Sequence, residues 1–120
     1  MRDAYESAPE DMLRANATSA IVFRQRVTAA LEEAGVPQAE TYWDHDEDEF
    51  RCTHSGYRYT SAVKENGKVV DIAVIGRTGV PDGVRQGERD ALVQQTRAAL
   101  KDAGIEVRVD EYGHLKAVNR

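Results

Sequence analysis

The Asn66-Gly67 dipeptide constrains the fold of this chain more than any other feature of the sequence. Asn and Gly both accept the positive φ angles of a type I′ turn, which joins two antiparallel strands in a tight hairpin. Apolar residues flank the dipeptide at strand-like spacing in residues 57–64 and 68–75. The pattern predicts a hairpin whose second strand is apolar on both faces and lies centrally in its sheet.

A second hairpin is predicted just upstream. Residues 50–54 alternate between apolar and polar side chains, and Ser55-Gly56 offers a tight turn before the strand that begins at Tyr57. We therefore expect the two strands on either side of Ser55-Gly56 to pair with each other.

Two other segments repeat their apolar residues every three or four positions, as amphipathic helices do. Ser7 and Glu10 fit a capping box, so the first helix is predicted from about residue 8 to Gly35, where glycine can close a helix in the left-handed conformation. The second helix is predicted to end in the same way at Gly104, because Ala29–Val36 resembles Ala98–Ile105. The apolar stripes of the two helices are Leu13, Ala17, Ala20, Phe23, Val27, Ala30, Leu31 and Ala34, and Leu92, Thr96, Ala99, Leu100 and Ala103.

Between the central strand and the second helix, the segment Gly76–Gly87 holds four glycines and Pro81, which predicts an irregular connection. After the second helix, the alternation around Val107 predicts another strand, and Leu115 with Ala117 indicates a short last one. A chain of 120 residues has the size of one domain. The prediction is a single α+β domain over residues 1–120, with an antiparallel sheet of four to five strands packed against two amphipathic helices in the order α-β-β-β-α-β(-β).

Charge and composition exclude several classes of function. The chain carries 16 Lys and Arg against 21 Asp and Glu, a formal net charge of −5 that repels phosphate backbones, so nucleic acid is not expected as a partner. Cys52 is the single cysteine, which excludes an intramolecular disulfide and a metal site built on several thiolates. No apolar run is long enough to cross a bilayer or to form a signal peptide, so the chain as written is expected in the cytoplasm, or exported if a signal precedes Met1.

The acidic run Asp44–Glu49 invites a metal interpretation, because hard cations favour clustered carboxylates. Asp44, Asp46 and Asp48 match the first, third and fifth positions of a calcium-binding loop. Glu49, however, stands where that loop requires glycine, and Ser55 stands where it requires glutamate. We expect an extended, solvated acidic loop before an edge strand, and no metal site.

Cys52 and His54 share one face of a predicted strand, as a nucleophile and its base would. No third group that could orient the histidine is apparent, and free cysteine is among the most buried residue types. The sequence therefore predicts a buried Cys52 and no catalytic residue.

Two further groups of residues are candidates for binding. Gly76-Arg77-Thr78-Gly79, with Arg85, lies between a strand and a helix, where backbone amides, a hydroxyl and guanidinium groups could hold an anion. The aromatic pairs Tyr42-Trp43 and Tyr57/Tyr59 suit a recognition surface or the core.

The order of several short motifs resembles the mature part of small actinobacterial lipoproteins over residues 20–110. The motifs are Leu31-Glu32-Glu33-Ala34-Gly35, Trp43, Cys52, Gly56-Tyr57-Arg58-Tyr59 and Leu100-Lys101-Asp102-Ala103-Gly104-Ile105. The resemblance implies an exported binding domain with a lipid tether outside this sequence and no catalytic residues.

We interpret the chain as a non-enzymatic binding or protein-interaction module that uses no cofactor and has a protein partner. The alternative is a small enzyme or anion-binding protein that uses the Gly76–Gly87 loop.

Overall fold

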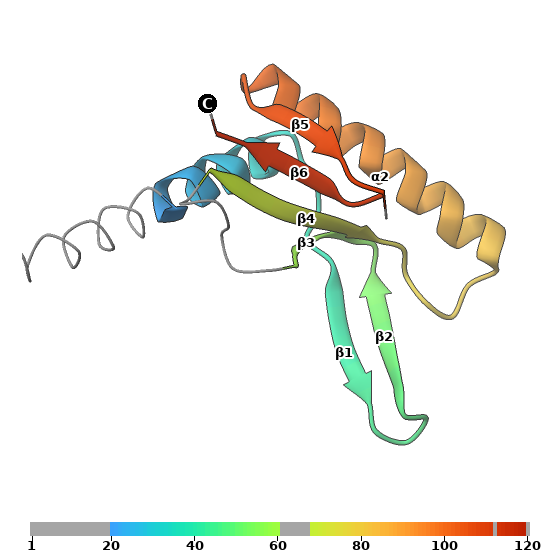
Figure 1. Ribbon diagram of the computed structural model, residues 1–120. Coiled ribbons are helices and arrows are strands. Elements are labelled where there is room, and N and C mark those ends of the chain that lie inside the picture. The colour runs from blue at the N-terminus through green and yellow to red at the C-terminus, as the bar shows by residue number, and fades with distance from the viewer. Residues whose placement is uncertain (1–19, 61–67, 112, 120) are drawn as a thin grey trace, which may run out of the picture.

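The structure is a computed structural model that describes residues 20–60, 68–111 and 113–119. It combines two helices with two antiparallel sheets, which confirms the predicted α+β class (Figure 1). The first helix is described from residue 20 to residue 33. The other elements are β1 (Glu40–Asp44), β2 (Glu49–His54), β3 (Gly56–Tyr59), β4 (Val69–Ile75), α2 (Asp82–Asp102), β5 (Glu106–Val109) and β6 (Leu115–Val118).

The main sheet has four strands in the order β3-β4-β6-β5, and every neighbouring pair is antiparallel. Pairs such as Tyr57 with Val74 and Ile72 with Leu115 set the register. Strand β4 therefore lies centrally, as its apolar sequence predicted, and its pairing with β3 is confirmed. The predicted turn at Asn66-Gly67, like the predicted start of the first helix near residue 8, lies outside the described residues.

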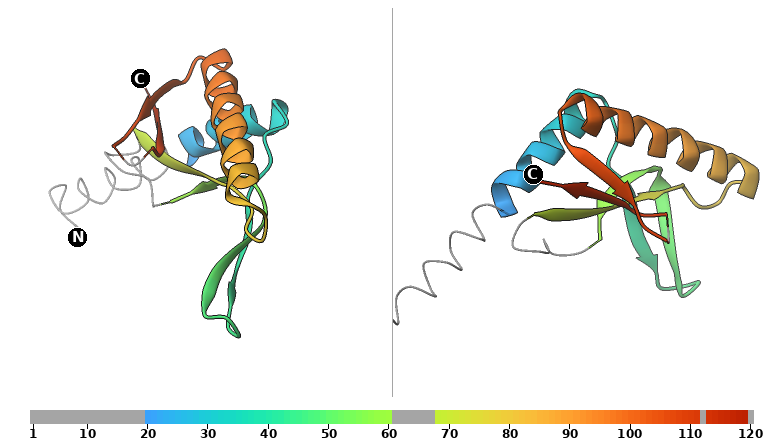
Figure 2. Two further views of the ribbon diagram at one scale, coloured as in Figure 1. Left: turned by 90° about the vertical axis from the view of Figure 1, so that its right-hand side faces the viewer. Right: turned by 45° about the horizontal axis from the view of Figure 1, so that its top comes forward.

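Both helices pack on one side of the four-stranded sheet (Figure 2). On β4, every second side chain faces them, and the same residues bury the apolar stripes of the helices. The core predicted from periodicity is confirmed for the described residues, except that Leu92 is half-buried at its margin and Ala34 and Ala103 are exposed. Leu13 and Ala17 of the predicted stripe lie outside the described residues. The buried cluster consists of Phe23, Val27, Leu31, Val36, Tyr57, Val70, Ile72, Val74, Ala99, Leu100, Ile105, Leu115 and Ala117.

The two helices end in the same capping motif. Gly35 has a φ of 75°, and the amide of the next residue, Val36, donates to the carbonyl of Leu31 at 2.9 Å. Gly104 repeats this geometry with the same φ, and the Ile105 amide donates to a carbonyl one turn earlier at 2.9 Å. These are the bonds of the Schellman motif, in which a left-handed glycine lets the chain satisfy the last carbonyls of a helix.

The predicted pairing across Ser55-Gly56 is wrong. Strand β2 pairs with β1 in a separate two-stranded sheet, while β3 pairs with β4. The chain instead crosses between the two sheets at Gly56, where an added Cβ would lie 2.4 Å from the Pro37 carbonyl oxygen. Because the Tyr57 amide donates to that same carbonyl at 3.0 Å, the glycine permits a backbone contact that a side chain would block.

The prediction of an irregular connection up to Gly87 is also wrong beyond Pro81. Helix α2 begins at Asp82 and includes Gly83 and Gly87 in its first two turns. Both glycines lie in open space, so each costs the helix only its intrinsic preference of about 1 kcal/mol. Arg85, between them, and Arg89, just after Gly87, hold the helix to the end of β4, as described below, and this tertiary contact outweighs the local propensity.

Candidate functional site

The β1–β2 hairpin projects away from the layer of helices and sheet (Figures 1 and 2). Its register pairs Trp43 with Phe50 and Tyr42 with Arg51. Because side chains alternate along a strand, Trp43 and Phe50 share one face of the hairpin and Tyr42 lies on the other.

The Trp43–Phe50 face carries a row of apolar side chains from the core outward. Cys52, on the same face nearest the body, is 1% exposed. Further out, Phe50 is 44% exposed and Trp43 is 49% exposed. The guanidinium of Arg58, on β3, lies over the Phe50 ring at 5.6 Å from the centroid. The hairpin thus carries two large aromatic side chains, half in solvent, on one surface.

The opposite face is polar apart from Tyr42, which is 50% exposed. There the Arg51 guanidinium lies 3.4 Å from a carboxylate oxygen of Asp44 and 3.2 Å from one of Glu49. The pair with Asp44 bridges the two strands close to the turn, while the pair with Glu49 lies within β2.

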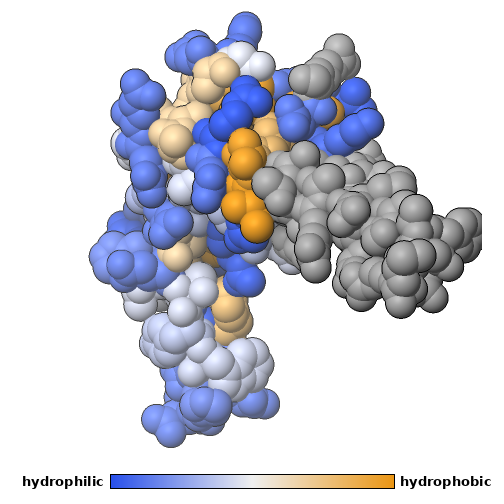
Figure 3. Space-filling view, turned by 90° about the vertical axis from the view of Figure 1, so that its left-hand side faces the viewer, coloured by the Kyte–Doolittle hydropathy of each residue, from blue (hydrophilic) through white to orange (hydrophobic). Residues whose placement is uncertain are grey.

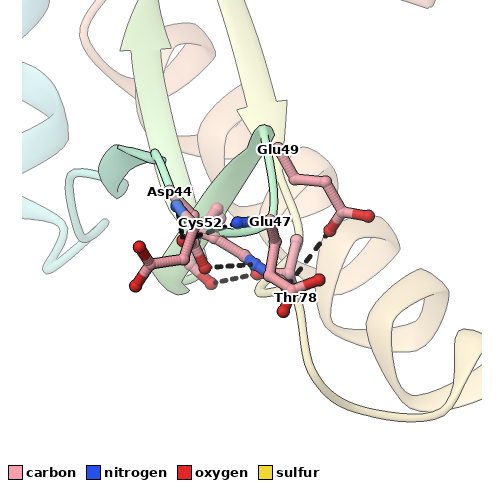
Figure 4. Close-up of polar contacts among 7 residues, drawn as sticks. Asp44, Glu47, Glu49, Cys52 and Thr78 are labelled. Carbon is pink, nitrogen blue, oxygen red and sulfur yellow. Dashed lines mark hydrogen bonds and ion pairs between the residues drawn. The ribbon is translucent and has the colours of Figure 1, made fainter.

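The acidic run forms the turn of this hairpin and is not the extended loop predicted. The Asp44 carboxylate accepts hydrogen bonds from the amides of Asp46 at 3.1 Å and Glu47 at 3.2 Å (Figure 4). Asp48 then takes a φ of 52°, which aspartate tolerates better than most residues. The Asp44 carboxylate is therefore engaged by its own turn and by Arg51. Over the described residues, no group of three or more His, Cys, Asp or Glu side chains is arranged to hold a metal ion.

The hairpin concentrates the negative charge of the protein. Residues 40–54 contain six carboxylates and one arginine, a formal charge of −5 that equals the net charge of the whole chain. The rest of the sequence carries 15 acidic and 15 basic residues. In Figure 3, which is coloured by hydropathy, the tip of the projecting lobe is hydrophilic and the surface above it is paler.

At its base, the hairpin is tied to the loop after β4 through Thr78 (Figure 4). The Thr78 hydroxyl accepts from the Cys52 amide at 3.0 Å and donates to the Cys52 carbonyl at 3.1 Å, and the Thr78 amide donates to the same carbonyl at 2.8 Å. Burial raises the pKa of the Cys52 thiol, which donates to the His54 carbonyl at 3.2 Å. Cys52 is thus a buried thiol, as predicted.

His54 and Cys52 do not form a catalytic pair. The His54 ring is exposed, and its Nδ1 lies 2.8 Å from a carboxylate oxygen of Glu40. The imidazole therefore contacts the strand opposite, while the thiol points into the protein.

A second tie joins the crossing point of the chain to α2. Glu88 accepts hydrogen bonds from Ser55 Oγ at 2.8 Å and from Arg77 Nε at 2.8 Å. The hydrogen bond from Arg77 and then that from Ser55 lower the pKa of the Glu88 carboxyl. The junction between β2 and β3, the loop after β4 and helix α2 are thereby connected through the Glu88 carboxylate.

The residues nominated for anion binding are placed close together, but most of their polar groups have other partners. Arg77 is engaged by Glu88, and Thr78 by the backbone of Cys52. Arg85 donates from Nε to the Gly76 carbonyl at 3.2 Å. Gly79, with a φ of 79°, lies in open space.

Arg85 and Arg89 have a structural role at the end of β4. Strand β6 pairs with β4 only as far as Ile72, so the later carbonyls on that side have no strand partner. Arg89 donates to the Val74 carbonyl at 3.2 Å, as Arg85 does to Gly76 one turn earlier on the helix. Both arginines line a cavity of about 360 Å³.

The aromatic candidates separate into core and surface. Tyr57 is 1% exposed, and its ring meets that of Tyr59 edge to face at 5.8 Å. Tyr59 is half-buried, with its hydroxyl 2.5 Å from that of Thr28 and Arg24 over its ring. Tyr57 is therefore a core residue and Tyr59 lies at the core margin, which leaves Tyr42 and Trp43 as the exposed aromatics of the candidate set.

Sequence reasoning missed Phe50 as a surface residue. Its alternation with Cys52 was visible, but its exposure follows from the pairing with β1, which the sequence did not predict.

No protein-family model, curated protein or solved structure matches this chain. None of the helices in the described ranges is both long enough and apolar enough to span a membrane.

Proposed function

We propose that this chain is a non-enzymatic protein-interaction module that binds its partner through the Trp43–Phe50 face of the β1–β2 hairpin. The observation that carries the proposal is the half-exposed aromatic pair on a projecting hairpin. Aromatic side chains supply large contact areas at low entropic cost and are enriched where proteins bind each other.

The attachment of the hairpin supports the same proposal. Thr78 fixes its base, and the ion pairs of Arg51 fix its turn region. A binding element that is ordered before it meets its partner loses less conformational entropy on binding. The hairpin therefore holds Trp43 and Phe50 in a fixed arrangement before the partner binds.

Photo-crosslinking in cells that express the protein tests the proposal. Benzoylphenylalanine in place of Phe50 is expected to crosslink a distinct partner, and Trp43→Ala in the same chain is expected to abolish that product. The control places the crosslinker at Val84 on α2, which is also 44% exposed. Identical products from positions 50 and 84, or a product that survives Trp43→Ala, would contradict an interaction through this face.

The alternative, an anion-binding protein that uses the Gly76–Gly87 loop, has weaker support. Arg85 and Arg89 border a cavity, but the Nε of each already donates a hydrogen bond to a backbone carbonyl. The charge of Arg77 is balanced by that of Glu88. An anion would have to compete with these contacts.

A further inference from the structure

Trp43 differs from Phe50, its neighbour on the same face, in having no cation from the described residues over its ring. Phe23, Phe50 and Tyr59 each have an arginine guanidinium over the ring, at 4.2 to 6.0 Å from the centroid. Within the described part of the chain, no cation lies over Trp43, although indole is the ring that attracts cations best. Its half-exposed ring therefore leaves room for a cation from another molecule.

The carboxylates of the adjoining turn are also available. Asp46, Glu47 and Asp48 are exposed in the turn, and none of them forms an ion pair with another described residue. The one arginine of the hairpin, Arg51, is engaged by Asp44 and Glu49 on the opposite face. The tip thus keeps a strong negative potential beside an apolar aromatic surface.

We infer that the partner of the Trp43–Phe50 face is a cationic segment of another protein, rich in arginine with apolar neighbours. This inference rests on the function proposed above. In the complex, a guanidinium lies on the Trp43 ring, apolar side chains cover Phe50, and further basic residues face the carboxylates of the turn. Arginine suits this surface better than lysine, because its planar group stacks on aromatic faces and is more weakly hydrated.

A second copy of this chain fits the surface poorly. The residues outside the hairpin carry no net charge, and many of their arginines already have partners, as Arg24 has in Tyr59 and Arg77 in Glu88. The charge complementarity therefore favours a different, basic protein.

Trp43 is the single tryptophan of the chain, so its fluorescence reports binding at this face without a label. The probes are a tryptophan-free peptide of alternating arginine and valine and its counterpart with glutamate for arginine. The arginine peptide is expected to change Trp43 emission saturably, and the glutamate peptide is expected to leave it unchanged. Salt near 1 M shortens the Debye length to about 3 Å and should weaken binding at least tenfold.

Matched variants locate the binding. Neutralising the turn with Asp46→Asn, Glu47→Gln and Asp48→Asn is expected to weaken binding of the arginine peptide at least tenfold. The control, Glu32→Gln, Glu33→Gln and Asp102→Asn, changes the net charge equally at exposed positions of the two helices and should leave affinity within twofold.

Aromatic variants test which face binds. Phe50→Ala is expected to weaken binding at least tenfold, whereas Tyr42→Ala, on the opposite face and similarly exposed, should not. Circular dichroism checks that each variant is folded.

Equal binding of the two peptides, equal loss in the two charge variants, or equal loss in the two aromatic variants would overturn the inference. If crosslinking from position 50 still captures a partner in that case, the interaction module stands and its partner is not cationic. If crosslinking is not specific to the hairpin, the proposed function itself fails, whatever the peptides do.

Discussion

Glu88 connects three parts of the protein through one side chain. It accepts hydrogen bonds from Ser55, where the chain passes from β2 to β3, and from Arg77 in the loop after β4. Arg77 also donates from Nε to the second carboxylate oxygen at 3.0 Å, and its Nη2 lies 2.8 Å from the first. Such a two-point contact fixes orientation as well as distance.

The lowered pKa of Glu88 predicts a pH dependence of stability. A carboxyl whose pKa is lower in the folded state stabilises that state above its unfolded pKa, near 4.5, and this contribution is lost as the pH falls through the folded value. Glu88→Gln should therefore flatten the fall in unfolding midpoint below about pH 4.5. Thermal unfolding from neutral pH into acid measures this effect. Glu33→Gln removes one charge at an exposed position, and an equal flattening there would contradict the assignment to Glu88.

Single residues were predicted well where local chemistry decides their conformation. Gly35 and Gly104 end their helices as expected, because only the left-handed conformation closes the motif and glycine adopts it readily. Tyr57 and Trp43 are both large aromatics, and their types do not distinguish core from surface. The strand pairing buries one and exposes the other, so the candidate site could be predicted only in part.

The hairpin shows why one element was missed and another misassigned. Strand β1 is half-exposed or exposed on both faces, so its sequence lacks the alternation that marks a strand with one buried side. Strand β2 was predicted from the alternation of its apolar and polar residues, but its partner could not be predicted without β1. The nearest turn signal, Ser55-Gly56, therefore suggested the wrong pairing.

The main sheet and the two helices follow directly from periodicity. Strand β4 is largely apolar on both faces: Val70, Ile72 and Val74 meet the helices, and on the other face Asp71 pairs with Lys116 of β6 at 3.5 Å. The start of α2 was misplaced because its glycines disfavour a helix locally. Arg85 and Arg89 stabilise the helix there through hydrogen bonds to backbone carbonyls at and after the end of β4, which the local sequence does not show.

The contacts in the turn of the hairpin predict that divalent cations do not change the stability of the protein. Asp44, the carboxylate best placed to anchor an ion, accepts two amides of its own turn and pairs with Arg51. A bound ion would stabilise the fold by about 2.7 kcal/mol at a hundred times its dissociation constant. Calcium, magnesium or zinc should therefore leave the midpoint of thermal unfolding unchanged.

Inorganic phosphate added in the same thermal-unfolding assay tests the alternative function, in which the Gly76–Gly87 loop binds an anion. A rise of several degrees with any cation that Asp44→Asn, Asp46→Asn and Asp48→Asn abolishes would instead establish a metal site in the turn.

At the scale of the whole molecule, the core and the hairpin are mechanically linked. The sheet and helices share one buried cluster, and the hairpin joins them through Thr78 on Cys52 and through the contacts of Glu88. Because these ties reach both the loop after β4 and α2, the hairpin should lose its structure when the core unfolds. The single tryptophan lies in the hairpin and most helical residues lie in the body, so two spectroscopic probes can follow the two parts separately.

Ile72→Ala tests this linkage. Ile72 is fully buried at the centre of β4, where it pairs with Tyr59 on one side and Leu115 on the other. Shortening its side chain should lower the free energy of unfolding by about 2 to 5 kcal/mol, because the loss of buried apolar surface and the cavity left behind both destabilise the fold. Urea denaturation followed by circular dichroism and by Trp43 fluorescence should show the same lowered midpoint with both probes, as in a two-state transition.

Val84→Ala, at an exposed position of α2, should change stability by no more than about 0.5 kcal/mol. A loss below about 1 kcal/mol for Ile72→Ala would contradict the central position of its side chain. An unshifted Trp43 midpoint would show that the hairpin unfolds independently of the body.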